Sequence, residues 1–149
     1  MQAPLRDQSK GRVLAVDDCA TMRLLLQAAL EASGYSVFAV DGDRAALDAI
    51  GSGGFDAVIL DVEMPEVDGM AVGRALRDNP RTAATLIALH TSLHESDVRI
   101  GFDQYDDFLV KPFGLLALGE RLDRLMLARI QRGPGGDGAT LVRGAMLVG

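Results

Sequence analysis

The chain of 149 residues contains one cysteine, no tryptophan and no apolar run of the ~18 residues that a membrane span requires. With Cys19 alone, an internal disulfide framework is excluded and a reducing compartment is indicated. Residues 1–10 lack the apolar core of a signal peptide. We therefore expect a cytoplasmic protein with no membrane partner.

The sequence also lacks the basic excess that is typical of nucleic-acid-binding proteins. It has 15 Lys and Arg against 21 Asp and Glu, a net charge of −6, so we expect no nucleic-acid partner. Its 48% apolar and 24% charged residues are ordinary for a globular protein, and its length suits one domain.

Short apolar runs alternate with amphipathic stretches along most of the chain. The runs that predict buried strands lie at 13–16, 35–40, 57–60, 84–91 and 107–110. Helical spacing of apolar residues between and after them predicts helices, including one over 68–77, a weaker one over 93–104 and a last one with a leucine stripe that ends near 133. This alternation predicts an α/β fold, a doubly wound parallel sheet of five strands, (βα)5.

We divide the chain into three parts. Residues 1–10 are polar and predict a flexible lead-in, and residues 11–132 contain the strands and helices of the domain. The glycine-rich residues 133–149 predict a disordered tail, too short for an output domain.

Chemically active side chains stand where the predicted strands end. They are Asp17, Asp18, Asp61, Thr91 and Lys111. The carboxyl ends of parallel strands meet at one edge, where ligands bind in such sheets. Each pair of carboxylates ~4 Å apart costs roughly 4 kcal/mol at an effective dielectric of ~20, so a cation is expected among them. Mg²⁺ prefers carboxylate oxygens, and together with a lysine it suits phosphoryl transfer to an aspartate.

Four segments, in order, strongly resemble the receiver domain of two-component response regulators, the CheY-like superfamily. They are VDD at 16–18, LDVEMPEVDG at 60–69, LHTS at 89–92 and FLVKPF at 108–113, within a resemblance over about 11–131. The resemblance implies a flavodoxin-like fold with strand order 2-1-3-4-5. It also implies a stand-alone signalling switch that catalyses only its own phosphoryl transfer and dephosphorylation.

The resemblance assigns a role to each residue at the phosphoryl site. Asp61 would accept a phosphoryl group from a sensor histidine kinase or a histidine phosphotransfer protein. Asp17, Asp18, Asp61 and the backbone carbonyl of Glu63 would hold Mg²⁺. Lys111 would pair with the phosphoryl group, and the Lys111-Pro112 peptide bond would be cis.

The resemblance also implies how the signal leaves the site. Thr91 would hydrogen-bond the phosphoryl group and act with Phe108 as the switch, altering the face formed by the fourth helix, fifth strand and fifth helix. This face would regulate a protein partner, as a monomer or a weak dimer. The 91–108 stretch looks about two residues shorter than in chemotaxis regulators, so we expect a short or mobile fourth helix.

Other interpretations stay open at this point. A haloacid-dehalogenase-like phosphatase also uses an aspartate nucleophile and Mg²⁺, but it resembles Asp-x-Asp, and position 19 here is a cysteine. A phosphorylation-independent adaptor on the same fold is a third interpretation. Thr91 could serve only as a strand former, and His90 is interpreted as a strand-end histidine rather than a zinc ligand.

Overall fold

Residues 8–64 and 67–132 are described by the structure, a computed structural model, and their centre is a five-stranded parallel sheet. Its strands are β1 (Arg12–Val16), β2 (Ser36–Val40), β3 (Ala57–Leu60), β6 (Leu86–Thr91) and β7 (Asp107–Val110). The spatial order is β2-β1-β3-β6-β7. This is the predicted order 2-1-3-4-5, so the flavodoxin-like α/β fold is confirmed.

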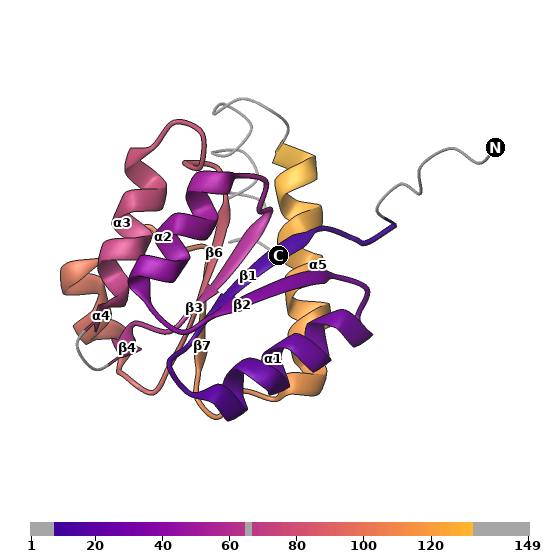
Figure 1. Ribbon diagram of the computed structural model, residues 1–149, viewed down its shortest axis with the longest axis horizontal. Helices are drawn as coiled ribbons and strands as arrows, with labels where there is room; N and C mark the ends of the chain where they lie inside the picture. Colours follow the sequence, from indigo (N-terminus) through magenta and orange to yellow (C-terminus); the bar gives the residue numbers. More distant parts are fainter. Residues whose placement is uncertain (1–7, 65–66, 133–149) are drawn as a thin grey trace, which may run out of the picture.

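Helices cover both faces of the sheet (Figure 1). They are α1 (Ala20–Ala32), α2 (Asp43–Ser52), α3 (Gly69–Asp78), α4 (Glu95–Gly101) and α5 (Leu115–Arg132). In Figure 1, α1 and α5 lie on one side of the sheet, and α2, α3 and α4 lie on the other. The predicted leucine stripe of the last helix is confirmed as core packing, because Leu118 and Leu122 are buried against the sheet.

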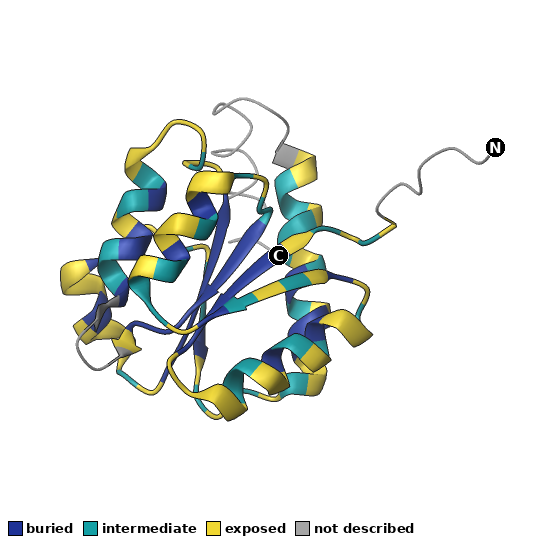
Figure 2. Ribbon diagram, in the orientation of Figure 1, coloured by how far each residue is buried: buried dark blue, intermediate teal, exposed yellow. Residues whose placement is uncertain are grey.

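The sheet separates two hydrophobic cores, because successive side chains of a strand point to opposite faces. In β6, Ile87 and Leu89 join the core beneath α2, α3 and α4. Leu86 and Ala88 join the core beneath α1 and α5. Figure 2 shows the strands as the most continuously buried part of the molecule. Because both faces of the sheet are buried, the sequences of the strands are unbroken apolar runs.

Two elements differ by two residues or more from their expected boundaries. The strand predicted at 84–91 begins at Leu86, because residues 82–85 form a turn in which the Thr85 N–H donates to the Thr82 carbonyl at 3.0 Å. The helix predicted over 93–104 spans only 7 residues. It ends where the backbone of Phe102 becomes extended, with φ −156° and ψ 122°, and the Phe102 side chain enters the core. The expectation of a short fourth helix is confirmed.

The segment after β3 contains a small hairpin that the sequence did not reveal. Its strands are β4 (Glu63–Met64) and β5 (Val67–Asp68), paired antiparallel.

The predicted cis peptide bond between Lys111 and Pro112 is present. None of the helices in the described ranges is long and apolar enough to cross a membrane. Most of the predicted lead-in, residues 1–7, and the predicted tail, 133–149, lie outside the described residues.

Candidate functional site

Three carboxylates meet at the carboxyl ends of β1 and β3. Carboxylate oxygens of Asp17, Asp18 and Asp61 all lie within 4.8 Å of one another. Asp17 and Asp61 are 1% and 3% exposed, whereas Asp18 lies at the surface. The pairing of Val16 with Leu60 brings the next residues of both strands, Asp17 and Asp61, side by side. The predicted cluster of acids is therefore brought together by the sheet register.

Lys111 neutralises part of this charge from the end of β7. Its Nζ donates to Oδ2 of Asp17 at 2.9 Å and to Oδ2 of Asp61 at 2.9 Å. Burial lowers the pKa of Lys111, but the hydrogen bonds to Asp61 and Asp17 outweigh burial and hold that pKa above its ordinary value. The amine therefore stays protonated at neutral pH. One cation is shared between two buried anions.

Asp61 is held by two donors. Oδ1 accepts the backbone N–H of Glu63 at 2.8 Å, while Oδ2 accepts from Lys111. Burial raises the pKa of Asp61, the two hydrogen bonds and the Lys111 charge lower it, and the Asp17 charge raises it; the net pKa stands above the ordinary value. Burial therefore outweighs these favourable contacts, and the ionised form of Asp61 is less stable than that of an exposed aspartate.

The oxygen donors fit a hard divalent cation. A cation among Asp17, Asp18 and Asp61 would relieve the charge that one lysine leaves uncompensated. The exposed position of Asp18 leaves that side of the cluster open to solvent. The role of the Glu63 carbonyl stays a prediction.

The Glu63 side chain reaches across the site. Its carboxylate accepts a hydrogen bond from the hydroxyl of Ser92. Glu63 belongs to β4, which follows β3, and Ser92 follows β6. This contact links the two loops that flank the acidic cluster.

Thr91 and Phe108 lie on β6 and β7, and the backbone carbonyl of Thr91 accepts the Lys111 N–H at 2.8 Å. Thr91 is fully buried at the end of β6, and its Oγ1 accepts the backbone N–H of Leu93 at 3.2 Å. Because side chains alternate along a strand, Thr91 is on the same face of the sheet as Leu89, beneath α2, α3 and α4. Phe108 is half-buried on the same face, with its ring 5.6 Å from that of Tyr105. Within the described residues no side-chain hydrogen bond joins Thr91 to the three carboxylates, and the switch role of Thr91 and Phe108 stays a prediction.

The sequence interpretation assigned no function to His90, which is 2% exposed. Burial and the charge of Lys111 lower the pKa of His90 to about 4, against a raising effect of Asp17. The imidazole is therefore neutral at pH 7, and the charges of Lys111 and Asp17 both act on its pKa. Strict alternation along β6 was the signal that could have found it, because His90 and Thr91 must face opposite sides.

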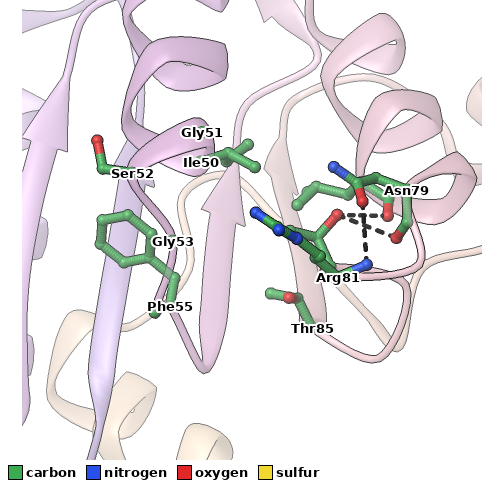
Figure 3. Close-up of a pocket in the computed structure, with 11 residues that line it drawn as sticks. Ile50, Gly51, Ser52, Gly53, Phe55, Asn79, Arg81 and Thr85 are labelled. Carbon is green, nitrogen blue, oxygen red and sulfur yellow. Dashed lines mark hydrogen bonds between the residues drawn. The ribbon is translucent and has the colours of Figure 1, made fainter.

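A separate pocket of about 290 Å³ lies at the other end of the sheet (Figure 3). Its walls come from the end of α2 and from the loops before β3 and β6, and include Phe55, Asn79 and Arg81. In Figure 3 the labelled Asn79 and Arg81 lie in one turn, where the Arg81 N–H donates to Oδ1 of Asn79 at 3.0 Å. The acidic cluster is not part of this pocket.

A parallel α/β sheet that gathers three carboxylates and a lysine at its carboxyl edge defines the class of protein. Residues 13–123 match the response regulator receiver domain family, and the chain belongs to it. The family is a signalling one, in agreement with the first of the three interpretations of the sequence. It supports phosphorylation-dependent signalling as the general activity.

Curated relatives are longer regulators. Response regulator MprA of Mycolicibacterium vanbaalenii is 40% identical over 130 residues, which cover 86% of this chain and 54% of MprA. A probable transcriptional regulatory protein of Picosynechococcus is 37% identical over 131 residues, covering 83% and 51%. The chain thus spans about half the length of these relatives. Since one of them is described as a transcriptional regulator, the expectation of no nucleic-acid partner stays a prediction.

Solved structures share the fold over nearly their whole length. Chemotaxis response regulator CheY4 of Vibrio cholerae is 30% identical with a TM-score of 0.71, covering 77% of this chain and 98% of CheY4. Response regulator TrrA of Thermotoga maritima, in complex with Mg²⁺-BeF, is 31% identical with a TM-score of 0.69, covering 77% and 98%.

Proposed function

We propose that the chain is a signalling switch in which Asp61 accepts a phosphoryl group from a phosphohistidine of a sensor histidine kinase or a phosphotransfer protein. The observation that carries the proposal is the shared Lys111 ammonium, 2.9 Å from a carboxylate oxygen of both Asp17 and Asp61. A buried aspartate with a fixed cation beside it is equipped to receive negative charge. Membership of the receiver family supports the same assignment.

In the transfer step, a carboxylate oxygen of Asp61 forms a bond to phosphorus as the phosphorus–nitrogen bond of the donor breaks. The electron pair of that bond stays on the imidazole of the donor. Lys111 keeps its proton and offers its charge to the phosphoryl oxygens, while the Glu63 N–H fixes the carboxylate. The residues of this chain act by position and charge, with no proton transfer of their own.

The metal assigned to this site is Mg²⁺. Asp17, Asp18 and Asp61 would hold it, with the backbone carbonyl of Glu63 as a further oxygen ligand. When bound, Mg²⁺ supplies positive charge to the carboxylates and the phosphoryl oxygens. The carboxylate geometry supports this assignment, because three oxygen donors converge within 4.8 Å.

The proposed output surface is formed by α4, β7 and α5. Each of these elements exposes a large apolar side chain: Ile100 at 87%, Val110 at 56% and Leu116 at 100%. Such residues favour contact with a protein partner or a weak contact with a second copy. Phosphorylation adds about −1.5 to −2 charge at Asp61, and we propose that Thr91 and Phe108 transmit it to this surface.

Incubation with acetyl phosphate and Mg²⁺, followed by intact mass measurement, tests the acceptor. We expect the wild-type chain to gain one phosphoryl group and Asp61→Asn to gain none. An unlabelled wild type, under conditions that label another receiver domain in parallel, would contradict the proposal. Label retained in Asp61→Asn would move the acceptor to another residue.

A further inference from the structure

The loop between α4 and β7 is tied to the rest of the molecule by Arg77 of α3. Nε of Arg77 donates to the carbonyl of Gln104 at 2.8 Å, and Nη2 donates to a carboxylate oxygen of Asp106 at 2.8 Å. The same Asp106 oxygen accepts the backbone N–H of Ile87 in β6 at 2.8 Å. Tyr105 therefore has a restrained residue on each side, and its backbone position is set by α3 and β6 together.

The ring of Tyr105 contacts two other aromatic rings. Its centroid lies 6.4 Å from that of Phe102, which directly follows α4, and 5.6 Å from that of Phe108 in β7. The ring planes are tilted by 50° and 57°, an arrangement that aromatic pairs favour. Tyr105 and Phe108 both pack against the core beneath α2, α3 and α4. A movement of the Phe108 ring therefore changes the packing of Tyr105 directly.

The hydroxyl of Tyr105 reaches the opposite end of α4. It donates to the carboxylate of Glu95, the first residue of that helix. Burial and the hydrogen bond to Glu95 raise the pKa of Tyr105 to about 12, so the hydroxyl keeps its proton at neutral pH. In the part of the chain that the structure describes, no other side chain of α4 forms a hydrogen bond or an ion pair.

The two ends of α4 are thus held unequally. At the last turn, Arg74 of α3 donates to the carbonyl of Gly101 at 2.9 Å, and the side chain of Phe102 is buried in the core. At the first turn, Glu95 is exposed and its side chain is held by Tyr105. A hydrogen bond at the surface contributes little net stability, because water competes for both partners. The first turn is therefore the end of α4 that moves more easily.

We propose that Tyr105 is a positioning residue of the switch, whose hydroxyl holds the first turn of α4 through Glu95 and resists activation. This inference rests on the proposed function, since it names a residue that regulates the same phosphoryl site. It adds a contact to the proposed route through Thr91 and Phe108. Phe108 has no hydroxyl of its own, and the neighbouring phenol supplies the polar contact to α4.

Phosphorylation separates the two partners of this hydrogen bond. Thr91 is the residue proposed to respond to the phosphoryl group on Asp61. Since residues 92–94 alone join Thr91 to α4, a movement of Thr91 toward the phosphoryl group carries Glu95 with it. Tyr105 does not follow, because its neighbours are tied to α3 and β6. The bond is therefore weaker in the active form, and a contact that favours one of two forms shifts the equilibrium toward that form.

The affinity for beryllofluoride, a phosphoryl mimic, tests this role in the presence of Mg²⁺. Titration is followed by the backbone amide signal of Asp61. Tyr105→Phe keeps the ring and removes the hydroxyl. We expect this variant to bind the mimic about 5-fold more tightly than wild type, at the lower end of the usual range of coupling between two sites. A purely structural role of the hydroxyl would lower stability and leave the affinity unchanged.

Tyr35→Phe is the matched control. The hydroxyl of Tyr35 also donates to a carboxylate, that of Asp123, but it lies on the side of the sheet covered by α1 and α5. This substitution removes the same kind of contact away from α4. We expect it to lower stability and to keep the wild-type affinity for beryllofluoride.

Substitutions of the acceptor test the same bond from its other end. Glu95→Gln retains an oxygen that accepts the hydroxyl, so its affinity should stay close to wild type. Glu95→Ala should reproduce the tighter binding of Tyr105→Phe. The double variant should bind no more tightly than either single variant, because all three lack one and the same bond. Since Glu95 is exposed, Glu95→Ala also serves if the aromatic substitution unfolds the chain, which thermal unfolding detects.

Unchanged or weaker beryllofluoride binding in folded Tyr105→Phe and Glu95→Ala would overturn the inference and leave the proposed function intact. Equal tightening in Tyr35→Phe would also overturn it, because the effect would then not depend on α4. A wild-type chain that neither binds beryllofluoride nor gains a phosphoryl group from acetyl phosphate would instead remove the proposed function, and this inference with it.

Discussion

At the scale of single residues, Lys111 connects the stability of the fold to the chemistry of the site. The Lys111 side chain is 21% exposed, and its ammonium lies between the side chains of Asp17 and Asp61, which are 1% and 4% exposed. Removing one partner from a buried ion pair leaves an uncompensated charge, which costs more than the pair contributes. The residue therefore stabilises the acidic cluster before any phosphoryl group arrives.

Replacing Lys111 with Met is expected to lower the free energy of unfolding by about 2–4 kcal/mol in the absence of divalent cations. Denaturant unfolding at pH 7 measures this. Lys10→Met is the matched control, because the Lys10–Asp123 pair is half-exposed at 3.2 Å and should contribute at most about 1 kcal/mol. Equal losses in the two variants would contradict the cluster's dependence on Lys111.

The lowered pKa of His90 predicts that the free energy of unfolding falls as the pH falls. Its pKa falls from 6.5 in the unfolded chain to about 4 in the fold, so the unfolded state binds more protons between these values. The stability that the neutral imidazole contributes is complete above pH 6.5 and is lost as the pH falls toward 4. The expected loss is at most about 3.5 kcal/mol, from ~1.4 kcal/mol for each pH unit.

Comparison with His90→Gln isolates this effect from other titrating groups. Between pH 7 and pH 4, the wild-type chain should lose more unfolding free energy than His90→Gln loses. His94→Gln, at an exposed position, should follow the wild-type curve. Parallel curves for wild type and His90→Gln would contradict the lowered pKa.

The sequence sufficed for Asp17, Asp61 and Lys111, because each directly follows an apolar strand and so must lie at the carboxyl edge. It did not reveal that the His90 imidazole is buried with neither ring nitrogen hydrogen-bonded within the described residues. A shift of one residue along a strand reverses the face of every side chain, and the register is set by contacts with the neighbouring strands.

At the scale of secondary structure, Gly69 fixes the approach of α3 to the end of β3. A Cβ at this position would lie 2.4 Å from the carbonyl oxygen of Asp61 and 2.7 Å from Cα of Val62. Both are backbone atoms, so the chain itself would have to move. The first turn of α3 thus packs directly against the backbone that carries the acceptor.

Gly69→Ala is expected to cost about 1–3 kcal/mol of stability, as overpacking does, and to slow the labelling of Asp61. Gly51→Ala, in α2, is the matched control because its Cβ would have no atom within 4 Å. That control should gain about 0.5–1 kcal/mol from the lower helix cost of alanine and keep the wild-type labelling rate. A Gly69→Ala chain with unchanged stability would contradict the close contact.

The length of α4 was predictable in part. The short chain between the fourth and fifth strands and the weak helical pattern indicated a short element. Its end was not visible, since Phe102 leaves helical geometry in order to fill the core beneath α3, where it lies close to Gly73. Tertiary packing of one aromatic ring decided the boundary, and local propensity did not.

At the scale of the whole molecule, topology gathers the charges that the sequence disperses. Asp18 and Lys111 are separated by most of the domain in sequence, yet the order β2-β1-β3-β6-β7 brings the ends of β1, β3 and β7 to one edge. This arrangement was predictable because repeated strand–helix units have few allowed connections. The same arrangement places three carboxylates beside a single lysine, so the fold stability should respond to divalent cations.

Addition of Mg²⁺ is therefore expected to raise the melting temperature of the wild-type chain relative to EDTA at equal ionic strength. A ligand that binds only the folded state at about 100 times its Kd stabilises by about 2.7 kcal/mol, a shift of roughly 5–20 °C for a domain of this size. Asp18→Asn removes an exposed carboxylate from the cluster. This variant should melt close to wild type in EDTA and show a smaller shift with Mg²⁺.

Asp48→Asn is the control, because Asp48 is an exposed acid on α2 that lies outside the cluster. It should show the full wild-type shift, which separates binding at the cluster from a general response of an acidic protein to cations. An equal shift in Asp18→Asn and Asp48→Asn would mean that Mg²⁺ acts through net charge alone. A smaller shift in Asp18→Asn only would locate the cation beside Asp61, where the charge of the incoming phosphoryl group must be balanced.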